Sequence, residues 1–178
     1  MKKLLSVILI SVFVLSLCSC GGGSSVTLTQ LCDDDETVKA TVSVDYGNGT
    51  VIDESTNTNE DESLLVNEAK DFSVELYLYF DDTYESFKED ASSEDGYKEI
   101  KYSGFDGYMY LYDDYEYEIC LKLADEMDNQ VFLFAYVAPA GELIDTETTD
   151  MEKIFGQKEV QDILNSIKYK GIKEIKGE

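Results

Sequence analysis

The chain has 178 residues and a formal net charge of −24, with 38 Asp plus Glu against 14 basic residues, all of them lysine, and no histidine. A surface this acidic repels phosphate backbones, and without arginine it lacks the side chain that most often reads bases, so nucleic acid is excluded as a partner. The absence of histidine excludes Ser-His-Asp and Cys-His nucleophiles and any zinc site with a histidine ligand.

The N-terminal segment has the features of a secretion signal. Lys2 and Lys3 precede an apolar stretch from Leu4 to Leu17. As a helix this stretch would span only ~21 Å, less than the ~30 Å hydrocarbon core of a bilayer. The pattern therefore favours cleavage over a permanent transmembrane helix.

The run Leu17-Cys18-Ser19-Cys20 at the end of this segment resembles the lipobox of bacterial lipoproteins. The resemblance implies lipidation of Cys20 as a diacylglyceryl thioether and removal of residues 1–19 as a signal peptide. It also implies an extracytoplasmic protein anchored to the bacterial cell membrane, because two acyl chains suffice for stable anchoring. The lysine-only, proline-poor composition favours a Gram-positive envelope. An ordinary signal peptide with a coincidental cysteine is the alternative.

The next segment is predicted to tether a single domain. Cleavage removes two lysines and no acids, which changes the net charge from −24 to −26 and keeps the domain away from anionic headgroups. Residues 20–36 begin with Gly and Ser and end in the acidic run Asp33–Glu36, a composition typical of a flexible, self-repelling tether. Residues 37–178 have the usual size of one domain and enough apolar side chains for a core.

The first part of this domain predicts a strand and a hairpin. Residues from Thr37 to Tyr46 alternate between polar and apolar, as in a half-buried strand. Gly47-Asn48-Gly49 tolerates positive φ, and Thr50-Val51-Ile52 follows it, which predicts a tight hairpin. The polar segment from Asp53 to Ser63 is predicted to be a loop.

This loop also raises the question of calcium. Oxygen-bearing side chains occupy every second position from Asp53 to Asp61. Thr58 stands where an EF-hand loop needs Gly, however, and Leu64 stands where it needs a bidentate Glu. We therefore predict no cofactor, with only weak Ca²⁺ association at this loop or at Asp33–Glu36, and keep a calcium-dependent module as an alternative.

The middle of the chain predicts a long antiparallel meander. Residues Phe72 to Phe80 alternate as a strand, and Asp82-Thr83-Tyr84-Glu85 resembles a capping box that begins a short helix reaching about Glu89. Three or four strands follow between Tyr97 and Ala138, separated by short turns, as antiparallel neighbours require.

The C-terminal part predicts a covering helix. The run Val131–Val137 is apolar on both faces, so both faces need a cover. Thr149-Asp150-Met151-Glu152 resembles a capping box for an earlier helical turn, and Gly171 is a suitable helix stop. The fold class is thus α+β, an antiparallel β-sheet of five to seven strands with a C-terminal helix packed on it. The apolar face of that helix has the spacing i, i+3, i+4, i+7 and consists of Val160, Ile163, Leu164 and Ile167.

The order of strand, loop and helix resembles the PsbP-like α/β/α sandwich of small secreted lipoproteins. The segment Asp162–Tyr169, with its Ile-Leu-x-Ser-Ile-Lys pattern, and the strand before it carry the resemblance, which extends over about residues 70 to 170. Members of that fold are chiefly non-catalytic binding or assembly proteins. The resemblance therefore implies a binding module and no particular reaction.

Two groups of residues are candidate sites. Cys32 and Cys120 are the thiols that remain after acylation of Cys20, and an extracytoplasmic location permits a disulfide between them. The alternative is that both thiols stay reduced. The second group is a possible binding surface of two tyrosine stripes, namely Tyr77 and Tyr79 on one predicted strand and Tyr108, Tyr110 and Tyr112 on another.

Tyrosine rings beside carboxylates suit the recognition of proteins or polysaccharides, because they supply contact area at low entropic cost. Burial of the stripes beneath a covering helix is the alternative. We therefore predict a non-catalytic binding or assembly module with an unknown protein or glycan as ligand. A small, glycosidase-like envelope enzyme that uses two carboxylates is the alternative function.

Overall fold

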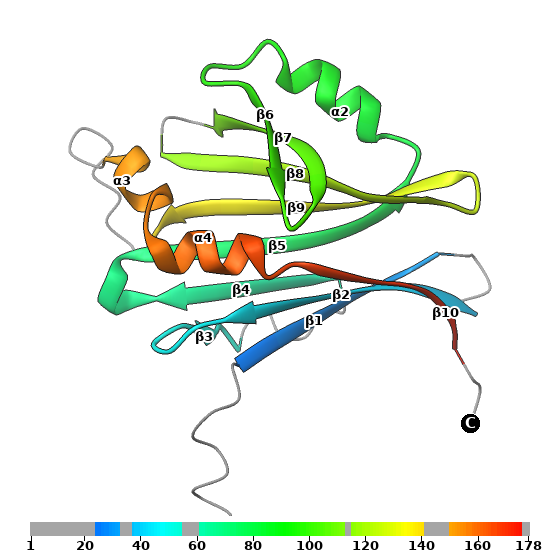
Figure 1. The fold of residues 1–178 in the computed structure, drawn as a ribbon, viewed down its shortest axis with the longest axis horizontal. Helices are drawn as coiled ribbons and strands as arrows, with labels where there is room; N and C mark the ends of the chain where they lie inside the picture. Colours follow the sequence, from blue (N-terminus) through cyan, green and yellow to red (C-terminus); the bar gives the residue numbers. More distant parts are fainter. Residues whose placement is uncertain (1–23, 33–36, 55–60, 113–114, 141–149, 176–178) are drawn as a thin grey trace, which may run out of the picture.

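The computed structural model describes residues 24–32, 37–54, 61–112, 115–140 and 150–175. Within these residues ten strands form two antiparallel sheets, accompanied by short helices (Figure 1). The predicted α+β class is confirmed, including the antiparallel sheet and the helix near the C-terminus.

The larger sheet has seven strands in the order β3-β4-β5-β9-β8-β7-β6. Every neighbouring pair in it is antiparallel. The predicted meander forms one half, β6 to β9, and β9 returns to pair with β5 at the centre. The strands are β3 (Val51–Ile52), β4 (Glu62–Asn67), β5 (Phe72–Asp81), β6 (Lys98–Tyr102), β7 (Phe105–Tyr112), β8 (Glu116–Glu126) and β9 (Asn129–Pro139), and a 3₁₀ turn, η1 (Glu68–Lys70), lies between β4 and β5.

Two-residue turns connect β6 to β7 and β8 to β9. Ser103 and Gly104 have φ of 52° and 91°, and Met127 and Asp128 have φ of 51° and 64°. Two consecutive central residues with positive φ define the primed turn whose twist matches that of the flanking strands. These turns connect β6 to β7 and β8 to β9 directly, and the β8–β9 pairing shifts register once, between Lys122 and Ala124.

The smaller sheet has three strands in the order β1-β2-β10: β1 (Ser24–Leu31), β2 (Val38–Tyr46) and β10 (Lys168–Glu174). The prediction of a flexible tether over residues 20–36 was wrong for Ser24–Leu31. Val26 and Leu28 are buried in the core, and they alternate with Ser and Thr as a strand requires. The signal segment, Cys20 and the acidic run Asp33–Glu36 lie outside the described residues.

The hairpin predicted after Tyr46 was also wrong. β2 and β3 belong to different sheets, and β3 pairs with β4. The Gly47–Gly49 turn exists, with the Thr50 amide donating to the Gly47 carbonyl at 3.2 Å, but it carries the chain from one sheet to the other. Gly171 does not stop a helix either, because it lies within β10 with a φ of 81°.

The described residues also include three short α-helices: α2 (Tyr84–Ala91), α3 (Met151–Phe155) and α4 (Lys158–Asn165). The Asp150 side chain accepts a hydrogen bond from the Lys153 amide at 3.0 Å, which caps α3 where an earlier helical turn was predicted. This cap lies one residue later than the predicted box, which pairs Thr149 with Glu152, and Thr149 lies outside the described residues. The capping box predicted at Asp82 was wrong. Asp81 instead accepts from the Thr83 amide at 2.7 Å, before α2 begins.

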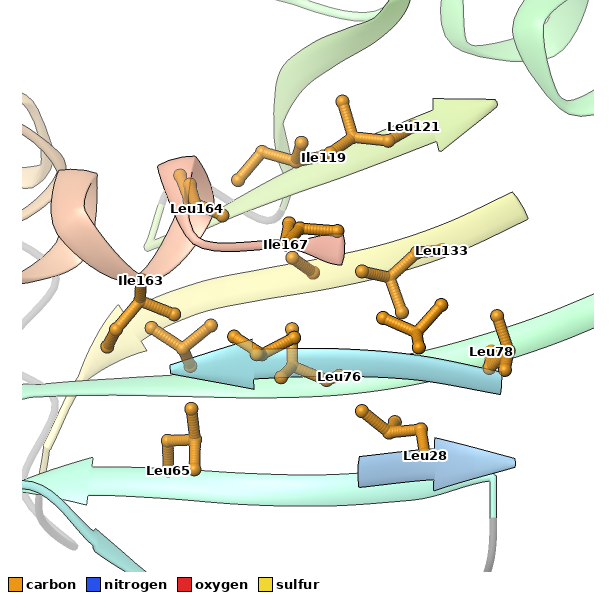
Figure 2. Close-up of a cluster of buried hydrophobic side chains, with 14 of the residues drawn as sticks. Leu28, Leu65, Leu76, Leu78, Ile119, Leu121, Leu133, Ile163, Leu164 and Ile167 are labelled. Atoms are coloured by element: carbon orange, nitrogen blue, oxygen red, sulfur yellow. The ribbon is translucent and has the colours of Figure 1, made fainter. Parts of the chain in front are cut away.

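The main core lies against one face of the larger sheet, which we call the aliphatic face. Side chains of β4, β5, β8 and β9 meet those of β1 and α4, as Figure 2 shows. Figure 1 shows α2 at the top of the view and the smaller sheet at the bottom, with α4 between them. The cover of the aliphatic face is thus a sheet together with helices. The labelled core residues are Leu28, Leu65, Leu76, Leu78, Ile119, Leu121, Leu133, Ile163, Leu164 and Ile167.

Candidate functional site

The opposite face of the larger sheet, which we call the aromatic face, carries rings on β5, β7 and β9. Side chains alternate between the two faces of a strand, so these rings point away from the aliphatic core. β8 contributes Glu118 and Cys120 to the same face. The rings are those of Tyr77, Tyr79, Phe132, Phe134, Tyr136, Tyr108, Tyr110 and Tyr112.

The predicted tyrosine stripes lie on this face, but only part of them is accessible. Tyr79 and Tyr112 are 38% and 45% exposed, whereas Tyr108 is fully buried. Tyr108 packs beneath α2 against the Tyr84 ring, with the ring centroids 6.1 Å apart, so its inclusion in a binding surface was wrong. The covering helix here is α2, because α4 packs on the other face. Tyr77 is half-buried and Tyr110 is buried.

Helix α2 covers only part of the aromatic face, and a half-open cleft of about 240 Å³ remains beside it. The sheet side of the cleft is formed by Phe134, Tyr136 and Glu118. Phe87 and Asp90 of α2 and Glu94, just after the helix, form the other side. The cleft therefore exists because a helix of only eight residues packs on a sheet face wider than itself.

The walls of the cleft are aromatic rings at right angles to its floor. The Tyr79 ring lies 5.4 Å from the Phe134 ring at an interplanar angle of 85°, and the Phe87 ring lies 5.4 Å from it at 87°. Tyr136 stacks beside Phe134, with centroids 5.9 Å apart and an angle of 21°. Such edge-to-face pairs are favourable because each ring has a positive edge and a negative face. The result is a concave site lined by aromatic rings on more than one side.

Glu118 supplies a buried carboxylate to the lining of this cleft. Cross-strand register places it directly between Tyr110 of β7 and Tyr136 of β9. Both phenols donate hydrogen bonds to the Glu118 carboxylate. Glu118 as a whole is only 9% exposed. Burial raises the pKa of Glu118, the two phenol hydrogen bonds oppose this, and the nearby Glu94 raises it further.

The cleft has no positive charge of its own. Its lining includes the carboxylates of Glu118, Glu94 and Asp90, and no lysine among the residues that the structure describes. The nearest lysine on α2, Lys88, pairs with Glu99 at 2.8 Å. Lys122 of β8 pairs with carboxylates elsewhere. The cleft is therefore negative both from its own groups and from the whole chain.

Sequence reasoning found the tyrosines but missed Glu118 as a site residue. The alternation of β8 did place it on the polar face of its strand, the same face as the Tyr108–Tyr112 stripe. The missing information was the register between β7 and β8, which pairs Tyr110 with Glu118. Alternation within one strand shows which face a residue is on, but it does not specify which residue of the neighbouring strand lies opposite.

The disulfide considered possible between Cys32 and Cys120 is not formed. Cys120 is buried in the cluster beneath α2 on the aromatic face. Cys32 packs against the core on the other side of the sheet, and its thiol donates to the Gln30 carbonyl at 3.4 Å. The smaller sheet covers the aliphatic face, so the segment carrying Cys32 never crosses the face of Cys120.

No group of three His, Cys, Asp or Glu side chains converges to hold a metal ion in the described ranges. Residues 55–60 of the loop considered for calcium, and the run 33–36, lie outside those ranges. Among the described helices, none is long and apolar enough to cross a bilayer.

Comparisons with protein-family models, with curated proteins and with solved structures return no match for this chain.

Proposed function

We propose that this chain is a membrane-anchored extracytoplasmic lipoprotein whose domain is a non-catalytic module that binds a protein or glycan in the cleft beside α2. The cleft supports this proposal: aromatic rings, convergent polar groups and a buried carboxylate with a raised pKa occur together in one concave site. Lipidation of Cys20 would hold this acidic domain at the membrane surface, where it meets ligands outside the cell.

A capture experiment tests the binding role. The purified full chain in mild detergent is immobilised and exposed to a glycan array and to bacterial envelope extract. We expect a ligand to be retained by wild type and by Tyr112→Ala, which alters an exposed ring outside the cleft, and lost with Tyr79→Ala. Equal retention of the ligand by the two variants would show that the ligand binds outside the cleft.

The anchor is tested separately by mass spectrometry of protein purified from membranes. We expect an N-terminus at Cys20 that carries a diacylglyceryl thioether. A Cys20→Ala variant should leave the membrane fraction. An unmodified cysteine in membrane-purified protein would contradict the lipoprotein part of the proposal while leaving the cleft unaffected.

A second candidate function is carboxylate-based hydrolysis of a glycan. Glu94 lies near enough to Glu118 to raise its pKa, and glycosidases use a pair of carboxyl groups of which one is held protonated. Turnover of cell-wall fragments by wild type, abolished by both Glu118→Gln and Glu94→Gln, would support this function. The phenol hydrogen bonds that stabilise ionised Glu118 favour the binding role instead.

A further inference from the structure

We propose, building on the function proposed above, that the cleft binds an alkylammonium group, with the ammonium against Glu118 and its apolar stem on the rings of Tyr79, Phe87 and Phe134. The group belongs either to a lysine side chain of a polypeptide or to a free primary amine. Both sources present the same chemistry to the cleft.

The buried carboxylate is the first argument. An ionised carboxylate has about four acceptor positions, and the Tyr110 and Tyr136 hydroxyls occupy two of them. The remaining acceptor positions can accept N–H or O–H donors, and a positive partner beside them would offset the cost of burying the ionised carboxylate. The cleft lining includes no basic side chain in the described part of the chain, so a positive partner for Glu118 would come from a ligand.

The ring geometry is the second argument. Tyr79 and Phe87 stand perpendicular to Phe134, at 85° and 87°, so that rings bound the cavity on more than one side. Aromatic faces attract cations through their quadrupole, most strongly where water is displaced. An alkyl stem can pack on such rings while its charged head reaches a polar group, as lysine side chains do.

The size and charge of the cleft restrict which ligands it can bind. At about 240 Å³ the cleft is smaller than the ~300 Å³ at which ligand pockets usually begin, so it accepts the end of a molecule. Glu94 and Asp90 at the rim extend the negative potential to solvent, which draws in cations and repels phosphates and carboxylates. A neutral sugar could stack on the rings but would leave Glu118 without a counter-charge.

Calorimetric titration of the full chain in detergent tests the proposal. The first pair of probes is n-butylamine and its neutral analogue 1-butanol. The second pair is a glycine-flanked lysine peptide and the same peptide with the lysine Nε-acetylated. We expect each charged probe to bind at least about tenfold more tightly than its neutral analogue, the range for a charge-assisted hydrogen bond. Stronger binding of the lysine peptide than of butylamine assigns the group to a polypeptide, and the reverse assigns it to a free amine.

Variants locate the interaction. Glu118→Gln keeps the shape of the side chain and should reduce amine affinity at least about tenfold, while Tyr112→Ala should leave it unchanged. A cooperative thermal unfolding transition for each variant is the control that the variant is folded. Equal binding of butylamine and butanol, or amine affinity that survives Glu118→Gln, would overturn the inference. If that occurs while Tyr79→Ala still abolishes capture of an envelope ligand, the cleft binds a group of different chemistry and only the ammonium assignment fails.

Discussion

The two faces of the seven-stranded sheet differ in chemistry although the same strands build them. The aliphatic face is covered by a second sheet and by α4, and its side chains on β5, β8 and β9 are almost entirely buried hydrocarbon. Among the described residues, the aromatic face is covered by the eight residues of α2 and by Tyr97 beyond it, and most of its large side chains are rings, several with a hydroxyl. The first face stabilises the fold and the second leaves a cleft open to solvent.

The two faces of one sheet thus serve different purposes: one stabilises the fold and the other offers the candidate binding site. Burial of hydrocarbon is the dominant favourable term in folding, so it is concentrated where the cover is complete. Rings with polar tips tolerate partial exposure, because the hydroxyl can remain solvated or hydrogen-bonded while the ring packs. Substitutions on the two faces should therefore affect different properties.

The largest effect is expected from Leu133→Ala, at the centre of the aliphatic face. Leu133 on β9 is fully buried, and removing its side chain loses burial and leaves a cavity, at a cost of about 2–5 kcal/mol. Tyr79→Ala on the neighbouring strand should cost clearly less, because 38% of Tyr79 is already exposed. Urea unfolding monitored by circular dichroism measures both changes. A smaller loss for Leu133→Ala than for Tyr79→Ala would contradict the assignment of stability to the aliphatic face.

Gly107→Ala should be the next most destabilising change. A Cβ at this position on β7 would lie 2.1 Å from the Cys120 carbonyl oxygen and 2.9 Å from a Leu121 methyl, so the strands would have to move apart. Overpacking of this kind costs about 1–3 kcal/mol. Gly47→Ala is the matched control, since a Cβ added at Gly47 would meet no atom within 4 Å. Equal unfolding midpoints for the two variants would refute the close approach at Gly107.

Glu118→Gln should produce a smaller effect of opposite sign, an increase in stability at neutral pH. Glu118 faces Tyr110, Tyr136 and Glu94, and its pKa is raised in the folded state, chiefly by burial. A raised folded pKa contributes stability below the unfolded pKa, and this contribution is lost as pH rises through the folded value. The glutamine variant has no such loss. Its Tm advantage over wild type should therefore be absent well below pH 4.5 and grow toward pH 7.

The control for this pH profile is Glu89→Gln, an exposed acid on α2. This substitution removes one negative charge from an exposed position and leaves the buried carboxylate of Glu118 in place. Its Tm difference from wild type should therefore depend much less on pH. An equal profile for the two variants would indicate that overall charge repulsion, and not the burial of Glu118, causes the change.

The smallest effect is expected from Tyr112→Ala. This ring is 45% exposed and contacts the Tyr110 ring edge-on at 6.3 Å, outside the cleft lining. We expect a change of about 0.5 kcal/mol or less in the free energy of unfolding, as for most surface substitutions. A loss comparable to that of Leu133→Ala would show that the aromatic face stabilises the fold beyond the cover of α2.

The sequence by itself determined β2, β5, the meander from β6 to β9 and the three helices, but it did not predict β1, β4 or β10. The alternation in β2, β5 and β8 specified both the strand and its apolar face, and the spacing of Val160, Ile163 and Leu164 specified α4. The same alternation placed Tyr77 and Tyr79 on the face opposite the core. These features are local, because side-chain direction follows from backbone geometry alone.

Only the tertiary structure decided which strands pair and what covers each face. Neighbouring segments β2 and β3 belong to different sheets, β1 and β10 complete a sheet with β2, and α2 instead of α4 covers the tyrosines. Tertiary strand pairing also decided the register that places Glu118 between Tyr110 and Tyr136. Strand pairing and burial join residues far apart in the chain, so their energies depend on the whole fold and have no local signature in the sequence.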